Sequence, residues 1–257
     1  FTVKKMTGAL NADKASVSVT KMKANLAGGG TAEGKLDYLP DKGALAAAVQ
    51  FKRAAINSIG FVKKYDSTLK GEAYGSIEAS GASSAVKISG NVEIRKTQLN
   101  GCDPFTMKSD FRYDGKSLNA ENVSSDAGYE GSFSVEFDKK NALNAVLTAK
   151  SARMDPAFAV FGLRAEDVRG RLSGEAKISG EPNALQGYGS FKAEKFKWAG
   201  ISAQKVETAF RLEKGVFILE RFALENGAEY VVLNGYCPIQ GVEPGYRPDP
   251  HAPAPIC

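Results

Sequence analysis

The chain repeats itself at a distance of about one hundred residues, and this repeat restricts the folds that are open to it. Four pairs of segments show the repeat: Ala44-Leu45 and Ala142-Leu143, residues 69–73 and 172–176, Val92 and Phe191, and Phe111-Arg112 and Phe210-Arg211. Their spacings are 98, 103, 99 and 99 residues. Val17 also precedes Phe217 by 200 residues, so two full units follow the end of a third. Such a repeat is typical of a stacked structure in which each unit contacts only its neighbours.

Strand patterns dominate these units. Five segments alternate between apolar and polar residues: 14–21, 85–89, 91–95, 132–138 and 208–213. This period of two places the apolar side chains on one face of a sheet and the polar side chains on the other. Tight hairpin turns are predicted at five glycine-containing sites: Gly28–Gly30, Asp114-Gly115, Asp126–Gly128, Lys214-Gly215 and Asn226-Gly227. We therefore expect an all-β, elongated antiparallel meander.

Two kinds of interruption are predicted within this meander. Asp155-Pro156 begins a short helix, with Asp155 as N-cap and Pro156 at the first helical position, and a polar turn follows at residues 165–168. The matching stretch of the first unit is residues 57–62. The apolar parity also switches between Ala193 and Phe196, which an extra residue at Glu194-Lys195 explains as a β-bulge. Because a bulge bends its strand, the sequence favours a curled sheet.

The repeat also sets the predicted organisation of the chain. Residues 1–66 are the end of a preceding β repeat, residues 67–140 and 141–240 are two further repeats, and residues 241–257 are a proline-rich disordered tail. The chain begins at Phe1 and its first repeat is cut short. We therefore expect an internal fragment of a longer protein, with any targeting sequence or membrane anchor upstream.

Charge and cysteine content narrow the functional classes. The net charge of +5 is spread along alternating strands, which is usual for a solvated sheet face and argues against nucleic-acid binding. A weak attraction to anionic membrane surfaces stays open. Cys102, Cys237 and Cys257 are an odd number of cysteines without metal-ligand spacing. They leave the redox compartment undecided, and a disulfide between Cys102 and Cys237 stays open as well.

The residues that most enzymes need are scarce in this chain. The only histidine, His251, lies in the proline-rich tail, so neither a Ser-His-Asp arrangement nor a zinc site is expected. The glycines at 28–30 and 187–189 do not open a helix after a strand, so they are turn glycines rather than a phosphate-binding loop. We expect no catalytic residues, no metal and no cofactor, and hence a protein that is not an enzyme.

The feature that remains is the one-sided hydrophobicity of the strands. The predicted apolar-face residues are Val17, Val19, Val86, Ile88, Val92, Ile94, Phe111, Tyr113, Phe133, Val135, Phe137, Phe191, Phe196, Trp198, Phe210, Leu212, Phe217 and Leu219. Two interpretations are open. These residues form the filled core of a sandwich or closed barrel, or they line an open groove that holds acyl chains. The many Ala, Ser and Gly residues of the strands favour the thin walls of a groove.

Several strand segments resemble a known family. They are Leu69 to Gly75, Lys87 to Val92, Leu172 to Pro182 and Val232 to Gly235. These segments are similar to the recurrent Leu-x-Gly and Gly-Pro strand signatures of the AsmA-like/TamB family, and residues 187–235 are the most similar stretch. The resemblance covers roughly residues 10–240.

The resemblance implies a U-shaped β-sheet groove, or β-taco, in the periplasm of a diderm bacterium. Family members act as bridge-like lipid transfer proteins that conduct phospholipids from the inner to the outer membrane and support outer-membrane biogenesis. An N-terminal helix anchors them in the inner membrane, and TamB-type members work with an outer-membrane barrel partner. Both of these regions would lie outside the present segment.

Two other functional classes stay open. A structural or adhesive cell-surface protein built from β repeats would use the same alternating pattern to fill a closed core. A glycan-active enzyme on a β scaffold would need clustered carboxylates and exposed aromatic side chains on one face, and Trp198 is the only tryptophan.

Overall fold

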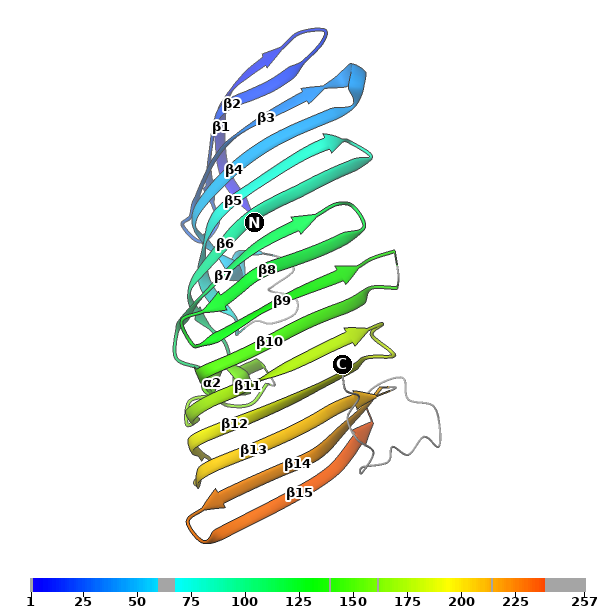
Figure 1. The fold of residues 1–257 in the computed structure, drawn as a ribbon. Coiled ribbons are helices and arrows are strands. Elements are labelled where there is room, and N and C mark those ends of the chain that lie inside the picture. Colours follow the sequence, from blue (N-terminus) through cyan, green and yellow to red (C-terminus); the bar gives the residue numbers. More distant parts are fainter. Residues whose placement is uncertain (1, 60–67, 139, 161, 214, 239–257) are drawn as a thin grey trace. The chain divides into compact units, whose positions relative to one another are not determined.

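The computed structural model describes residues 2–59, 68–138, 140–160, 162–213 and 215–238 (Figure 1). The predicted tail at residues 241–257, together with His251 and Cys257, lies outside these residues. The chain divides into two compact units, Phe1–Asp126 (unit 1) and Ala127–Cys257 (unit 2). The predicted repeat boundaries after residues 66 and 140 stay predictions.

About three quarters of the described residues lie in strands. Unit 1 contains β1 (Val3–Ala12), β2 (Val17–Leu26), β3 (Thr31–Leu39), β4 (Ala44–Ala55), β5 (Lys70–Ala82), β6 (Ala85–Gln98), β7 (Phe105–Tyr113) and β8 (Ser117–Ser125). Unit 2 contains β9 (Tyr129–Glu136), β10 (Ala142–Arg153), β11 (Arg169–Gly180), β12 (Gln186–Trp198), β13 (Ile201–Glu213), β14 (Val216–Asn226) and β15 (Glu229–Pro238). The short helices are η1 (Pro40–Lys42), η2 (Ile56–Ser58) and α2 (Asp155–Val160).

Within each unit the strands pair antiparallel and follow one another in chain order, β1 to β8 in unit 1 and β9 to β15 in unit 2. In the described part of the chain, β1 pairs only with β2 and β15 only with β14, so the strands do not close into a barrel. The predicted all-β antiparallel meander is therefore confirmed. The hairpin turns predicted at Gly28–Gly30, Asp114-Gly115 and Asn226-Gly227 are confirmed, because each connects two paired strands of one unit. The site at Asp126–Gly128 falls between β8 and β9 in the sequence, and Lys214 of the remaining site lies outside the described residues.

A bulge interrupts the pairing of most even-numbered strands, and it repeats along the chain. At each one an extra residue in the strand adopts a left-handed backbone conformation: Lys21 in β2 (φ 51°), Arg53 in β4 (55°), Lys96 in β6 (53°), Asn122 in β8 (52°), Ser151 in β10 (49°) and Lys195 in β12 (55°). The bulge predicted at Glu194-Lys195 is confirmed. Strands six apart carry bulges 98 to 101 residues apart, so one repeat corresponds to six strands.

The predicted helix of unit 2 is present as α2. It begins at Asp155, and the N–H of Phe158 donates to the carbonyl of Met154 over 3.2 Å, one residue before the predicted N-cap. The predicted turn at 165–168 is present too, because the N–H of Val168 donates to the carbonyl of Ala165. At the matching place of unit 1, the described residues contain η2, and residues 60–62 of the predicted stretch lie outside the description.

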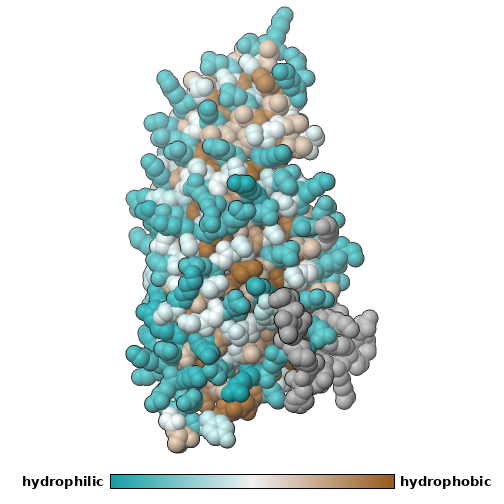
Figure 2. All heavy atoms as spheres, in the orientation of Figure 1, coloured by the Kyte–Doolittle hydropathy of each residue, from teal (hydrophilic) through white to brown (hydrophobic). Residues whose placement is uncertain are grey.

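The register of the strands sorts their side chains onto two faces. Residues paired across neighbouring strands share a face, and each bulge places two successive side chains on the same side. On this basis no described Asp, Glu, Lys or Arg of β2 to β14 lies on the face that carries most of the aliphatic and aromatic residues. We call this the apolar face and the opposite one the polar face. Val146, Val216 and Ile218 lie on the polar face, in register with charged residues. Figure 2 shows hydrophilic side chains over most of the surface that it presents.

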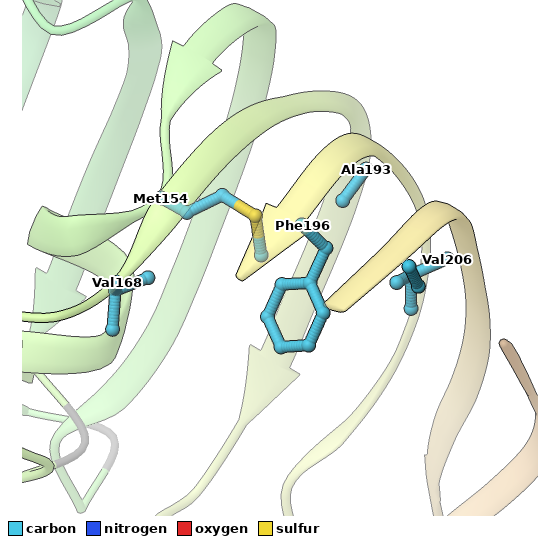
Figure 3. Packing of buried hydrophobic residues seen from close by; sticks show 6 residues of the cluster. Met154, Val168, Ala193, Phe196 and Val206 are labelled. Atoms are coloured by element: carbon cyan, nitrogen blue, oxygen red, sulfur yellow. The ribbon is translucent and has the colours of Figure 1, made fainter. Parts of the chain in front are cut away.

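Part of the apolar face is packed in each unit, close to the bulges. The buried cluster of unit 1 contains Leu26, Phe51, Ala54, Ile56 and Ala73. The buried cluster of unit 2 contains Met154, Val168, Ala193, Phe196, Ala203 and Val206. In Figure 3, Phe196 lies at the centre of the second cluster, between Met154 and Val168 on one side and Ala193 and Val206 on the other. We call these two clusters the packed region.

Candidate functional site

The remaining apolar face of unit 1 is an open region, because its side chains are only partly covered. Ile88 lies in the middle of this region, with Ala79 of β5 and Tyr113 of β7 as its cross-strand partners. All three side chains are half-buried. The described residues of unit 1 thus leave apolar surface accessible beyond the packed region.

Unit 2 has a corresponding open region that is richer in aromatic side chains. Phe191, Phe210 and Phe217 are each half-buried and lie on three neighbouring strands. At the other side of the unit, Phe133 and Leu147 are 41% and 42% exposed. Side chains of this size normally find cover inside a protein, so their exposure marks the apolar face as the candidate functional site.

The predicted groove residues divide between the open and the packed regions. Fourteen are half-buried: Val17, Val19, Val86, Ile88, Val92, Ile94, Phe111, Tyr113, Val135, Phe191, Trp198, Phe210, Phe217 and Leu219. Phe133 and Phe137 are exposed, whereas Phe196 and Leu212 are buried. Val92 and Ile94 pack against the buried cluster of unit 1, and Trp198 packs against that of unit 2. The groove assignment stays a prediction at all of these positions.

Several apolar-face residues were absent from the sequence prediction. They include Leu36, Tyr38, Leu45, Val49, Ile77, Leu143, Leu147 and Ile178, all of which share the register of the predicted residues. The alternation Lys35-Leu36-Asp37-Tyr38 is a signal that could have identified the first two.

The polar face carries hollows and ion pairs. A hollow of about 720 Å³ in unit 1 is lined mainly by polar-face residues, with three cationic and three acidic side chains among them: Lys35, Lys87, Arg112, Asp37, Glu78 and Asp114. Ala79, Ile88 and Tyr113 of the apolar face also contribute to its lining. This balance of charge selects no single class of ligand. In unit 2, Glu207 lies 2.9 Å from Lys205 and 3.5 Å from Lys192. The hydrogen bond from Lys205 lowers the pKa of Glu207. These exposed pairs are those of a solvated sheet face.

A polar anchor fixes α2 at the end of β10. The guanidinium of Arg153 holds the buried carboxylate of Asp155 in a two-point contact, with Nε–Oδ1 at 3.1 Å and Nη2–Oδ2 at 2.7 Å. The hydroxyl of Tyr129 donates to the carbonyl of Arg153. Burial raises the pKa of Tyr129, and the negative charge of Asp155 adds to the rise. The anchor therefore holds the helix beside the packed region.

Three further features of the described residues concern metal binding, membrane-spanning helices and the cysteines. Within the described ranges, no three His, Cys, Asp or Glu side chains come close enough together to hold a metal ion. No helix of this part of the chain is both long and apolar enough to cross a membrane. Cys102 is buried after β6, and Cys237 is exposed in β15. Among the described residues no disulfide joins these two cysteines, a pairing that the sequence leaves open.

No protein-family model matches the chain, and neither a curated protein nor a solved structure was found to be similar to it.

Proposed function

We propose that this protein is a non-enzymatic lipid carrier that shields acyl chains on the apolar face of its sheet. The observation that carries the proposal is the separation of charge: the described strands β2 to β14 keep every charged side chain on the polar face, while much of the apolar face is left uncovered. Each methylene group removed from water is worth roughly 0.8 kcal/mol. A wide apolar surface without charges therefore lowers the cost of moving an acyl chain through water.

The cellular setting of the proposal comes from the resemblance of the strand segments to AsmA-like proteins. On that basis the cargo is phospholipid, and the path runs between the inner and outer membranes through the periplasm. A membrane anchor and an outer-membrane partner would be supplied by regions outside this segment. These elements are expectations from the resemblance, whereas the carriage of acyl chains is supported by the distribution of side chains.

The competing function is that of a structural or adhesive β-repeat protein. It is favoured by the two buried clusters, which show that part of the apolar face is filled by the protein's own side chains. The two functions differ in what covers the open region. A carrier leaves this region to a lipid, whereas a structural protein covers it with protein in its working form.

Photocrosslinking distinguishes the two functions. A photoreactive amino acid replaces Ile88 or Phe210 on the apolar face, and Ser89 or Ala209 provides the neighbouring control on the polar face. The variants are illuminated with vesicles of phosphatidylethanolamine and phosphatidylglycerol. The carrier function predicts lipid adducts at positions 88 and 210 and none at 89 and 209. Absence of adducts at both apolar positions, in folded variants, would overturn the proposal.

A further inference from the structure

Three phenylalanine rings form a continuous aromatic surface in the open region of unit 2. The ring centroids of Phe191 and Phe210 lie 6.5 Å apart with 15° between the ring planes, and those of Phe210 and Phe217 lie 5.2 Å apart with 28°. The residues come from β12, β13 and β14, and each is half-buried. Rings at these separations are offset from one another. They therefore form a row over three strands instead of a face-to-face stack.

Glycine allows the middle ring to lie close to the backbone. Gly189 of β12 is the cross-strand partner of Phe210, and it is buried. Atoms Cε1 and Cζ of Phe210 both lie 2.6 Å from the position that a Cβ at residue 189 would occupy. Gly189 is not among the glycines with a positive φ angle. The backbone therefore does not require glycine here, and the ring does.

The same pairing of ring and glycine recurs in both units. Gly174 faces Phe191, with ring atom Cδ1 2.8 Å from the added Cβ position, but there the carbonyl oxygen of Ser190 lies nearer, at 2.1 Å, and the φ angle of 151° also favours glycine. In unit 1, Gly90 faces Phe111, with Cζ at 2.9 Å and the carbonyl oxygen of Ser76 nearer, at 2.1 Å. The pair Gly90 and Phe111 precedes the pair Gly189 and Phe210 by 99 residues. The sequence repeat thus preserves a flattened ring as well as a strand pattern.

We propose that Phe191, Phe210 and Phe217 form a binding platform for an extended acyl chain, and that Gly189 keeps its surface flat. This inference rests on the proposed function and assigns it a specific site. The apolar-face residues that border the rings are Ala176, Leu212, Leu219 and Gly235. Thr208, opposite Phe191, and Cys237, opposite Phe217, border the rings as well. None of these six residues is charged, and the hydroxyl of Thr208 and the thiol of Cys237 are the hydrogen-bonding side-chain groups among them. A sugar or a peptide would lose its hydrogen bonds with water on such a surface, whereas a hydrocarbon chain would lose none.

A substitution that pushes the ring of Phe210 away from the backbone tests the platform without making the site more polar. In Gly189→Ala the added methyl group displaces the ring of Phe210 and makes the face less even, although the substitution adds apolar surface. We expect the affinity for a fluorescent fatty acid to fall about fivefold to tenfold, which corresponds to one aromatic contact. In the double variant Gly189→Ala/Phe210→Leu the added methyl group no longer meets a ring, so the affinity should equal that of Phe210→Leu alone, with no further loss from the alanine. Ser190→Ala, on the polar face of the same strand, is the matched control and should bind as the parent does.

A second variant keeps the test decisive if Gly189→Ala does not fold. Phe210→Leu retains an aliphatic side chain but removes the middle ring, and we expect a loss of similar size with the circular dichroism spectrum unchanged. Parent-like affinity in every folded variant of Gly189 and Phe210 would overturn the platform. In that case lipid adducts at position 88 of unit 1 would show that the proposed function survives, and their absence would show that both proposals fail.

Discussion

The comparison of two isoleucines of unit 1 tests whether the open region differs from a protein core. Ile88 is half-buried in the open region, whereas Ile56 is 4% exposed in the packed region. Aspartate at position 88 keeps access to water, so we expect it to cost about 1 kcal/mol of burial and up to about 1 kcal/mol of strand preference. Aspartate at position 56 leaves a cavity worth about 2–5 kcal/mol and buries an unpaired carboxylate. That sum approaches the whole stability of a typical domain.

Ile88→Asp should weaken lipid binding strongly, although it lowers the stability of the fold only modestly. A carboxylate at position 88 would be desolvated by a bound acyl chain or would push it away, with the loss of contact to about three methylene groups. At roughly 0.8 kcal/mol each, this amounts to about 2.4 kcal/mol, or about a fiftyfold loss of affinity. Urea unfolding and titration with a fluorescent fatty acid measure the two quantities. Ser89→Asp controls for charge and strand preference, because Ser89 lies on the polar face in register with Glu78 and Arg112.

The outcome that refutes the reasoning is specific. If Ile88→Asp unfolds as readily as Ile56→Asp, position 88 is part of a filled core. If Ile88→Asp instead binds the fatty acid as tightly as Ser89→Asp does, the open region of unit 1 does not hold acyl chains.

Three further predictions concern the bends, the anchor of α2 and alkaline pH. Lys195→Gly should raise the free energy of unfolding by up to about 1 kcal/mol, because the left-handed backbone at this bulge disfavours a side chain; Lys192→Gly in the same strand should lower it. Asp155→Ala should cost about 2–3 kcal/mol in urea unfolding, because it breaks a largely buried ion pair, whereas Glu130→Ala, in an exposed pair, should cost less than about 1 kcal/mol. Burial raises the pKa of Tyr129, so the unfolded state releases the proton of this hydroxyl at a lower pH than the folded state does. The free energy of unfolding should therefore fall as pH rises through about 10. A Tyr129→Phe variant that loses as much stability at alkaline pH would contradict this assignment.

The sequence predicts the strands and their faces well because both depend on local alternation. The bulge at Lys195 was predictable, since the large side chain of Phe196 makes the change of parity visible. The bulges at Arg53 and Ser151 escaped prediction, because the residues that follow them, Ala54 and Ala152, are too small to mark a face.

The division into packed and open regions could not be predicted from local sequence. Ile56 and Ile88 have the same side chain, and their different burial depends on which distant segments reach them. The contact between Gly189 and Phe210 also depends on the cross-strand register, which joins residues 21 positions apart in the sequence. Periodicity identifies the apolar face, but long-range packing decides which part of it is left accessible.

Thiol labelling tests the central claim most directly, since it asks whether the apolar face is accessible without lipid and covered with it. Ile88→Cys and Ile56→Cys are compared in a variant in which Cys237 and Cys257 are serine, while the buried Cys102 is kept. We predict that a maleimide labels position 88 rapidly in the lipid-free protein, that phospholipid vesicles slow this labelling, and that position 56 reacts slowly in both conditions. Labelling at position 88 that is as slow as at position 56 without lipid, or that lipid leaves unchanged, would contradict the claim that this face receives acyl chains.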